Sequence, residues 1–182
     1  AVVDSVPAVG YHGRGAGLLY ARAQDALGDA WHSPVTVDAA SLAGVHSSLA
    51  EVAGHPALGY LDFASGDLRY ARAADAAGTS WAPQIVDADG DTGYGASLAV
   101  VDGHPAVSYY ARHEGLRYVR AADTAGATWQ AAVLVDADPA TYDRTSLAVV
   151  DGHPAIAYPI GNPAVLTYVR ATNAEGTAWG AP

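Results

Sequence analysis

The chain repeats itself four times, and this repetition limits the folds that it can adopt. One segment of each repeat ends in a tryptophan and follows the consensus Leu-x-Tyr-x-Arg-Ala-x-(Asp/Asn)-x-x-Gly-x-x-Trp. The tryptophans lie 50, 48 and 50 residues apart, so the repeating unit has about 49 residues. Self-similarity at such a period is typical of solenoids and propellers. The four copies of the segment span 18–31, 68–81, 116–129 and 166–179.

The sequence pattern of each unit predicts four short strands. In the third unit an apolar run at 97–101 is followed by the tight-turn signal Asp102-Gly103 and by a second β-rich run at 104–110. A third strand is expected at 116–121, with a fourth after it, and no segment shows helical periodicity. Many short, evenly spaced strands in such a repeat indicate an all-β propeller. A β-solenoid fits less well because its coils are usually shorter, and a sandwich would not repeat four times.

The turn that ends in the tryptophan resembles the Asp-box of bacterial-type sialidases and related propellers, which reads Ser-x-Asp-x-Gly-x-Thr-Trp. Here one extra residue separates the aspartate from the glycine, and alanine stands in place of the serine. The whole unit is also similar to tandem repeats of large bacterial secreted or surface proteins. The resemblance implies a propeller in which this turn is a structural staple between the third and fourth strands and lies outside the active site.

Three repeated positions are expected to have structural roles. An aspartate can accept amide hydrogen bonds across its own turn, and a tryptophan can cover that turn. An arginine can bond to carbonyls or to the turn aspartate, and we expect it to pack between blades. Four-fold repetition argues against a single functional site, which would need the units to differ. The residues are Trp31, Trp81, Trp129, Trp179, Arg22, Arg72, Arg120, Arg170, Asp25, Asp75, Asp123 and Asn173.

The units are expected to form one domain, and the last blade should lack most of its fourth strand because no apolar run follows Trp179. Such a blade would leave an edge open to pairing. Three arrangements fit: a closed four-bladed ring, half of an eight-bladed ring made by two chains, or part of a longer array. The domain covers 1–182, with blades at about 1–44, 45–94, 95–143 and 144–182.

Function is expected where the repeats differ. In a propeller the interblade connections and the loops between second and third strands share one face, and these segments vary here. They carry aromatic rings and planar polar groups of the kind that sugars need. The candidate ligand-binding residues are His46, Tyr94, Arg112, His113, Tyr142, Asp143 and Arg144.

One variable connection, 87–93, alternates aspartates with other residues and bends at Gly90. Oxygens from Asp87, Asp89 and Asp91 could bind Ca²⁺, which prefers such ligands. The segment lacks the length and the bidentate glutamate of an EF-hand loop. A solvated acidic turn is therefore the competing interpretation.

Composition excludes several classes of function. The net charge of −10 disfavours binding to nucleic acid or to an anionic membrane surface. Cysteine is absent, so the chain has neither disulfides nor a thiolate zinc site. Serine-hydrolase, zinc-protease, P-loop and dinucleotide motifs are also absent, and no catalytic residue is assigned.

The sequence thus favours a non-enzymatic binding or scaffold module, secreted or on the cell surface. Its variable loop face would bind a carbohydrate or a protein, and the chain could associate with itself into a larger ring. One alternative is a glycan-active hydrolase of the Asp-box propeller type, which would need two carboxylates ~5 to 10 Å apart in one pocket. The other is a purely structural or engineered repeat protein.

Overall fold

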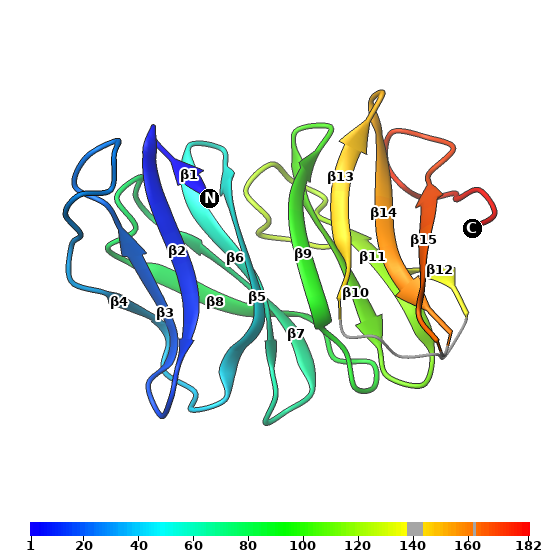
Figure 1. The fold of residues 1–182 in the computed structure, drawn as a ribbon, viewed down its shortest axis with the longest axis horizontal. Coiled ribbons are helices and arrows are strands. Elements are labelled where there is room, and N and C mark those ends of the chain that lie inside the picture. Colours follow the sequence, from blue (N-terminus) through cyan, green and yellow to red (C-terminus); the bar gives the residue numbers. More distant parts are fainter. Residues whose placement is uncertain (138–143, 162) are drawn as a thin grey trace.

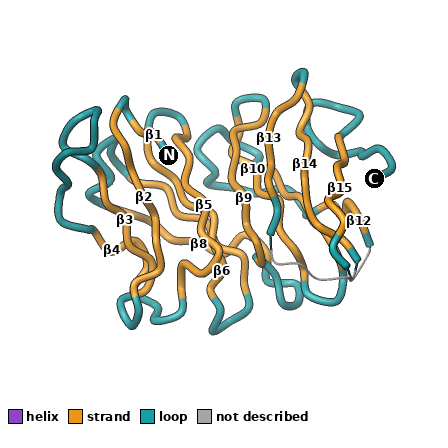
Figure 2. The backbone as a smooth tube through the Cα atoms, in the orientation of Figure 1, coloured by secondary structure: helices purple, strands orange, loops and turns teal. Residues whose placement is uncertain are grey.

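The computed structural model describes residues 1–137, 144–161 and 163–182. Within these ranges the chain forms fifteen β-strands in four antiparallel sheets and no helix (Figure 1). Figure 2 shows that loops alone connect the strands. The all-β class expected from the repeat is confirmed. No helix of the described residues is long and apolar enough to cross a membrane.

Strand order in each sheet follows the sequence, and each strand pairs antiparallel with the next. The first sheet contains β1 (Val2–Val3), β2 (Val6–Gly13), β3 (Gly17–Arg22) and β4 (Val35–Asp38). The second contains β5 (Ala43–Val52), β6 (His55–Asp62), β7 (Asp67–Ala73) and β8 (Trp81–Asp87). The third contains β9 (Tyr94–Val101), β10 (His104–Ala111), β11 (Gly115–Arg120) and β12 (Val133–Asp136). The fourth contains β13 (Ser146–Val150), β14 (His153–Ile160) and β15 (Val165–Arg170).

The first hairpin of each sheet closes through a two-residue turn with positive φ at both central positions. In the third sheet these are Asp102 (φ 48°) and Gly103 (φ 76°). This geometry matches the right-handed twist of the flanking strands. The first sheet makes the same turn with Asp4 (φ 46°) and Ser5 (φ 64°), which places a β-carbon where the other sheets have glycine.

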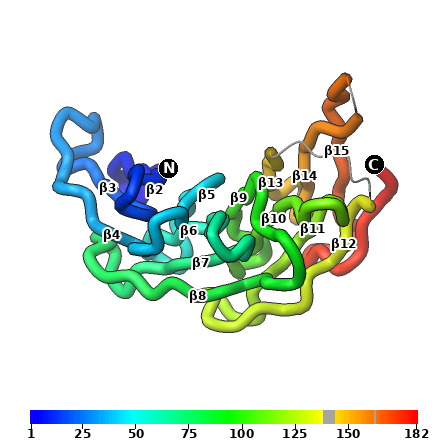
Figure 3. Tube along the Cα trace, turned by 90° about the horizontal axis from the view of Figure 1, so that it is seen from below, coloured from blue at the N-terminus to red at the C-terminus, as the bar shows by residue number. Residues whose placement is uncertain are grey.

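The four sheets follow one another in an arc (Figure 3). The inner side of the arc is formed by β2, the second strand of the first sheet, and by the first strands of the other three sheets, where β2 packs on β5, β5 on β9 and β9 on β13. The extensive contacts between described sheets join only sheets that are neighbours in sequence. The first and fourth sheets lie at opposite ends of the arc, so the described residues do not form the closed four-bladed ring that was one of the expected arrangements.

The core lies between the sheets. Three apolar clusters form, one at each junction of neighbouring sheets. In each junction a fully buried tyrosine of one sheet meets the tryptophan of the next sheet, as edge-on or tilted ring pairs. Such pairs stabilise beyond the area they bury. The pairs are Tyr20 with Trp81 (5.0 Å between ring centroids), Tyr70 with Trp129 (5.1 Å) and Tyr118 with Trp179 (5.2 Å).

A hydrogen bond to a carboxylate also recurs at each junction. The hydroxyl of Tyr60 in β6 donates to Oδ2 of Asp38, the last residue of β4, at 2.7 Å. Burial and this bond raise the pKa of Tyr60 well above its usual range, so the hydroxyl remains a donor. The equivalent pairs are Tyr109 with Asp87, and Tyr158 with Asp136 (2.6 Å).

The turn before each tryptophan is organised by its aspartate or asparagine. The Asp123 carboxylate accepts amide hydrogen bonds from Ala125 and Ala127 at 3.0 Å and from Thr128 at 2.7 Å. These bonds, led by that of Ala127, hold the pKa of Asp123 well below its usual range. The indole Nε1–H of Trp129 then donates to the carbonyl of Gly126 at 3.0 Å.

The repeated arginines bond to carbonyls, as the sequence suggested, and these carbonyls belong to their own sheets. Arg72 in β7 donates from Nε to the carbonyl of Val52 and from Nη2 to that of Ala53, both at 3.0 Å. Arg120 makes the equivalent bonds in the third sheet. The arginines thus supply donors to the backbone carbonyls at the tight first turn of each of these sheets.

Candidate functional site

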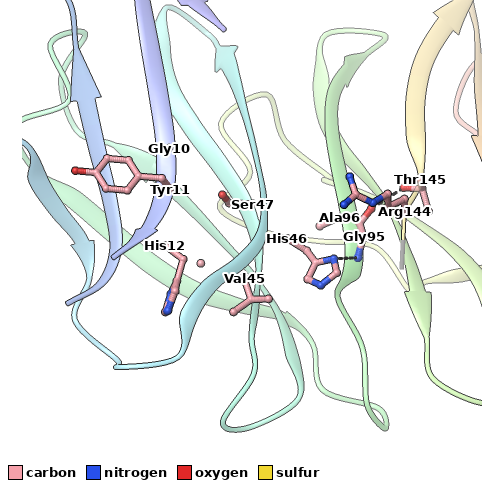
Figure 4. A pocket seen from close by; sticks show the side chains of 11 residues that line it. Gly10, Tyr11, His12, Val45, His46, Ser47, Gly95, Ala96, Arg144 and Thr145 are labelled. Atoms are coloured by element: carbon pink, nitrogen blue, oxygen red, sulfur yellow. Dashed lines mark hydrogen bonds between the residues drawn. The ribbon is translucent and has the colours of Figure 1, made fainter. Parts of the chain in front are cut away.

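A pocket of about 670 Å³ lies where the inner strands of the arc converge (Figure 4). Its size falls within the usual range of small-molecule sites, about 300–1,000 Å³. Strands β2, β5 and β9 and the segment just before β13 each contribute to its wall. All four sheets therefore meet at this one place. The lining residues are Gly10, Tyr11, His12, Gly44, Val45, His46, Ser47, Gly95, Ala96, Arg144 and Thr145.

Two serines at equivalent repeat positions join the inner strands beside the pocket. The Ser48 hydroxyl oxygen in β5 accepts the amide of Leu98 in β9 at 3.0 Å. One repeat later, Ser97 in β9 accepts the amide of Leu147 in β13 at the same distance. These side-chain bonds connect sheets whose strands share no backbone ladder. They hold the walls of the pocket at a fixed spacing.

His46 is held in a strained and defined orientation. Its φ of +52° is uncommon for a residue with a β-carbon, and the ladder between β5 and β6 shifts register between Val45 and Ser48. The amide of Gly95 donates to Nδ1 of His46 at 3.1 Å. Because Nδ1 accepts this bond, the neutral ring carries its hydrogen on Nε2.

His12 on β2 has the opposite tautomer. Its Nδ1 lies 2.8 Å from the carbonyl oxygen of Ala43. A carbonyl can only accept, so Nδ1 carries the hydrogen and Nε2 of the neutral ring is an acceptor. The pocket wall thus holds two histidines of opposite tautomer.

The far wall of the pocket combines a cation with a hydroxyl group. Thr145 is fixed by its hydroxyl, which donates to the carbonyl of Gly95 at 2.9 Å and lies 2.7 Å from the Ser108 hydroxyl. Arg144 beside it is exposed and forms no ion pair with any described residue. The described part of the lining contains no aspartate or glutamate.

An aromatic cluster adjoins the pocket through His46. The rings of His46 and Tyr94 meet edge-on at 6.0 Å, and those of Phe63 and Tyr94 at 6.3 Å. The Arg112 guanidinium lies 5.7 Å from the centre of the Tyr94 ring and 3.6 Å from the Asp91 carboxylate. Phe63 is 52% exposed, which leaves its ring accessible.

The structure brings together part of the set that the sequence proposed. His46, Tyr94 and Arg112 are in one connected cluster, and Arg144 lines the same pocket as His46. His113 lies apart, in the exposed turn between β10 and β11 with φ +67°. The remaining two candidates, Tyr142 and Asp143, lie outside the described residues.

Sequence reasoning missed His12 and Phe63. Both carried a signal, because each breaks the repeat. His12 follows the second-strand tyrosine where the other units have Leu61, Tyr110 and Pro159, and Phe63 is the only phenylalanine in the chain. A residue-by-residue comparison of the units would have selected them.

The three aspartates proposed for calcium pair with arginines. Arg117 lies 3.0 Å from Asp87 and 3.9 Å from Asp89, and Arg112 lies 3.6 Å from Asp91. Asp87 also accepts a hydrogen bond from Tyr109, and the Asp89 side chain is 92% exposed. No group of three or more metal-ligating side chains is found among the described residues.

A search against protein-family models finds no match, and a search of curated proteins finds none either. Solved structures do resemble the fold. A GH43 endo-arabinanase from Bacillus licheniformis aligns with a TM-score of 0.63 and 13% identity, over 97% of this chain and 71% of that one. An α-L-arabinofuranosidase (CtGH43) from Clostridium thermocellum gives 0.59 and 10%, over 90% and 60%. A protein of unknown function from Dyadobacter fermentans gives 0.62 and 15%, over 89% and 50%.

At these identities the similarity establishes the fold alone. The GH43 enzymes are propellers, so the chain has a β-propeller-like fold. None of the three structures is titled a sialidase, and they lend no support to the Asp-box resemblance. The chain spans half of the Dyadobacter protein and 60% of the Clostridium enzyme.

Proposed function

We propose that this chain is the glycan-recognising part of a propeller and that the pocket on the inner side of the arc holds the sugar. The observation that carries the proposal is the convergence of all four sheets on one polar pocket of about 670 Å³. A volume of this size suits a short oligosaccharide better than a protein surface.

The polar groups of the pocket suit hydroxyl-rich ligands. A hydroxyl group both donates and accepts hydrogen bonds. His12 supplies an acceptor that is fixed by a backbone partner, and Arg144 supplies a donor. Preorganised groups lose little conformational entropy when a ligand binds. Tyr11 in the wall, 38% exposed, offers a ring on which the apolar face of a sugar can pack.

The fold neighbours suggest which glycans to test first. Two of them are titled α-L-arabinofuranosidase and endo-arabinanase, and both names refer to arabinose-containing glycans. Arabinan oligosaccharides are therefore the first probes, with xylo- and cello-oligosaccharides as the comparison.

Isothermal titration with arabinan oligosaccharides tests the proposal. We expect saturable binding, weakened about tenfold in Arg144→Ala and in His12→Ala, since each loses a hydrogen bond worth roughly 1 to 1.5 kcal/mol. Arg14→Ala is the matched control, because Arg14 is exposed in the turn after β2 and does not line the pocket. The proposal would be refuted if Arg14→Ala weakened binding as much as the pocket variants do, or if none of these oligosaccharides bound.

Hydrolysis of a glycosidic bond is the second candidate, favoured by the enzyme titles of the similar structures. It requires a carboxyl pair, about 5 Å apart or 6.5–9.5 Å apart depending on the mechanism. The carboxylate that described contacts connect to the pocket is Asp91, through Tyr94 and His46. Release of reducing ends from arabinan, abolished by Asp91→Asn with binding retained, would support hydrolysis. Binding without release would leave recognition as the function.

A further inference from the structure

The tyrosine–tryptophan pair that joins neighbouring sheets is incomplete at both ends of the arc. Tyr20, Tyr70 and Tyr118 are at most 1% exposed, whereas Tyr168, the equivalent residue in β15, is 51% exposed. At the opposite end Trp31 is 41% exposed, and no described tyrosine packs on it. The chain therefore presents one half of the same joint at each end.

The environments of these two residues also match the internal joints. Leu166 beside Tyr168 is 79% exposed, although its equivalents Leu18, Leu68 and Leu116 are fully buried. Beside Trp31, Gly28 is only half-buried, whereas its equivalents Gly78, Gly126 and Gly176 are buried. Each end is thus an apolar surface of the kind that the internal joints cover.

The internal joints depend on a glycine that lets a tyrosine ring approach closely. A β-carbon on Gly78 would lie 2.4 Å from the ring of Tyr20, and one on Gly126 would lie 2.7 Å from the ring of Tyr70. Gly28 has the same backbone conformation, with φ +77°, yet a β-carbon there would meet only Pro7 and Trp31 of its own sheet. The space above Gly28 is where a tyrosine ring would fit.

We propose that the Trp31 end of one chain docks on the Tyr168 end of a second copy and rebuilds the internal joint. The Tyr168 ring would lie over Gly28 and against the indole of Trp31. In one of the three internal joints the Tyr70 hydroxyl donates to the carbonyl of Ala125 at 3.1 Å, whereas the buried hydroxyls of Tyr20 and Tyr118 have no hydrogen-bond partner. By the same geometry, the Tyr168 hydroxyl would donate to the carbonyl of Leu27.

The contact is heterologous, because two different surfaces meet. Such contacts close into a ring when the rotation permits and otherwise extend into a filament. The described residues supply the tyrosine–tryptophan part of the joint at both ends. They do not supply the tyrosine–aspartate bond, since no carboxylate in the fourth sheet occupies the position of Asp38.

Light scattering of the eluting protein in size-exclusion chromatography tests the proposal. We expect a mass above the 18.5 kDa of one chain that rises with concentration. Gly28→Ala should weaken association about 30-fold or more, as substitutions at well-packed aromatic contacts do. Gly54→Ala is the control, because its φ of +76° imposes the same backbone cost and nothing lies within 4 Å of its β-carbon. A wild-type protein that stays monomeric at every concentration, or two glycine variants that associate alike, would overturn the proposal.

A mixing experiment identifies the two surfaces directly. The Trp31→Ala variant keeps the surface around Tyr168 intact, and the Tyr168→Ala variant keeps the surface around Trp31 intact. Each variant alone should be a monomer, since every joint of its own copies lacks one ring. Their mixture should form a heterodimer through one intact joint. Association of either variant alone, or failure of the mixture to associate, would contradict the docking that we propose.

Discussion

The ring of Tyr118 in the third sheet lies 5.2 Å from the indole of Trp179 in the fourth, and the two meet edge-on. The same contact occurs at the other two junctions of the arc. A segment that looks like a local turn signature in the sequence therefore connects neighbouring repeats in the structure. The repeats depend on one another for their cores.

This dependence predicts the effect of removing one buried ring. Tyr70→Ala should lower the free energy of unfolding by about 3 to 5 kcal/mol, because it leaves a cavity beneath Trp129. Tyr168→Ala removes the equivalent but exposed ring and should cost less than about 0.5 kcal/mol in dilute solution. Urea denaturation of both variants measures the difference, and equal losses would contradict the role given to the joint.

A glycine pair separates packing from backbone strain. Gly78→Ala and Gly103→Ala should each lower the free energy of unfolding by about 1 to 2 kcal/mol through backbone strain alone. Both glycines have a left-handed backbone conformation, with φ of +75° and +76°. Only at Gly78 would the new carbon clash with a buried ring, that of Tyr20. We expect an additional loss of about 1 to 3 kcal/mol there, measured by thermal or urea unfolding. A Gly78→Ala protein as stable as the Gly103→Ala protein would disprove the close approach.

Asp38 should make stability depend on pH. Burial alone would raise its pKa, but the amide of Ala40, the hydroxyl of Tyr60 and the guanidinium of Arg69 outweigh burial and lower it. A carboxyl group whose pKa is lower in the folded than in the unfolded protein stabilises the fold at any pH above its ordinary pKa of about 4. This stabilisation is lost as the pH falls from that value through the pKa of the folded protein. Asp38→Asn should therefore cost roughly 1.5 to 3 kcal/mol at pH 7 and progressively less toward pH 3. Urea titrations at several pH values check this, and a gap that does not narrow in acid would contradict it.

The turn carboxylates offer an internal comparison, because the fourth unit has asparagine at this position. Asn173 accepts the amides of Gly176 and Thr177 at 3.0 Å, and its amide nitrogen lies 2.6 Å from the Thr177 hydroxyl. We expect Asp123→Asn to keep the turn and lose a little stability at neutral pH. The loss should begin to shrink at about pH 4, the ordinary pKa of an aspartate, and should shrink further as the pH falls toward the depressed pKa of folded Asp123. Asp123→Ala should be less stable at every pH, and unfolding curves for both variants distinguish the two effects.

Local features of the fold could be predicted from the sequence. The pair Asp102-Gly103 specifies its turn through its own backbone preferences, and the period of the repeat indicates the sheets. A bond from Arg120 to carbonyls was expected, but the identity of those carbonyls was not predictable in the same way. It depends on how the folded hairpin places Val101 and Asp102 beside the guanidinium.

The pocket was only partly predictable for a related reason. His46 and Arg144 were selected because their positions vary between repeats. His12 belongs to the same pocket but lies on β2, the second strand of the first sheet. Only the curvature of the arc brings it near His46. The tautomers of the two histidines depend on backbone groups, Gly95 and Ala43, that are distant from them in sequence.

The central claim is that a glycan occupies the pocket between the inner strands. Backbone amide chemical shifts, followed by NMR during titration with an arabinan oligosaccharide, test it most directly. The account predicts shifts at the lining amides of Ser47, Gly95 and Ala96, while Gly54 and Gly103 in the distant hairpin turns stay unchanged. Shifts confined to those turns, or no shifts at saturating sugar, would contradict it.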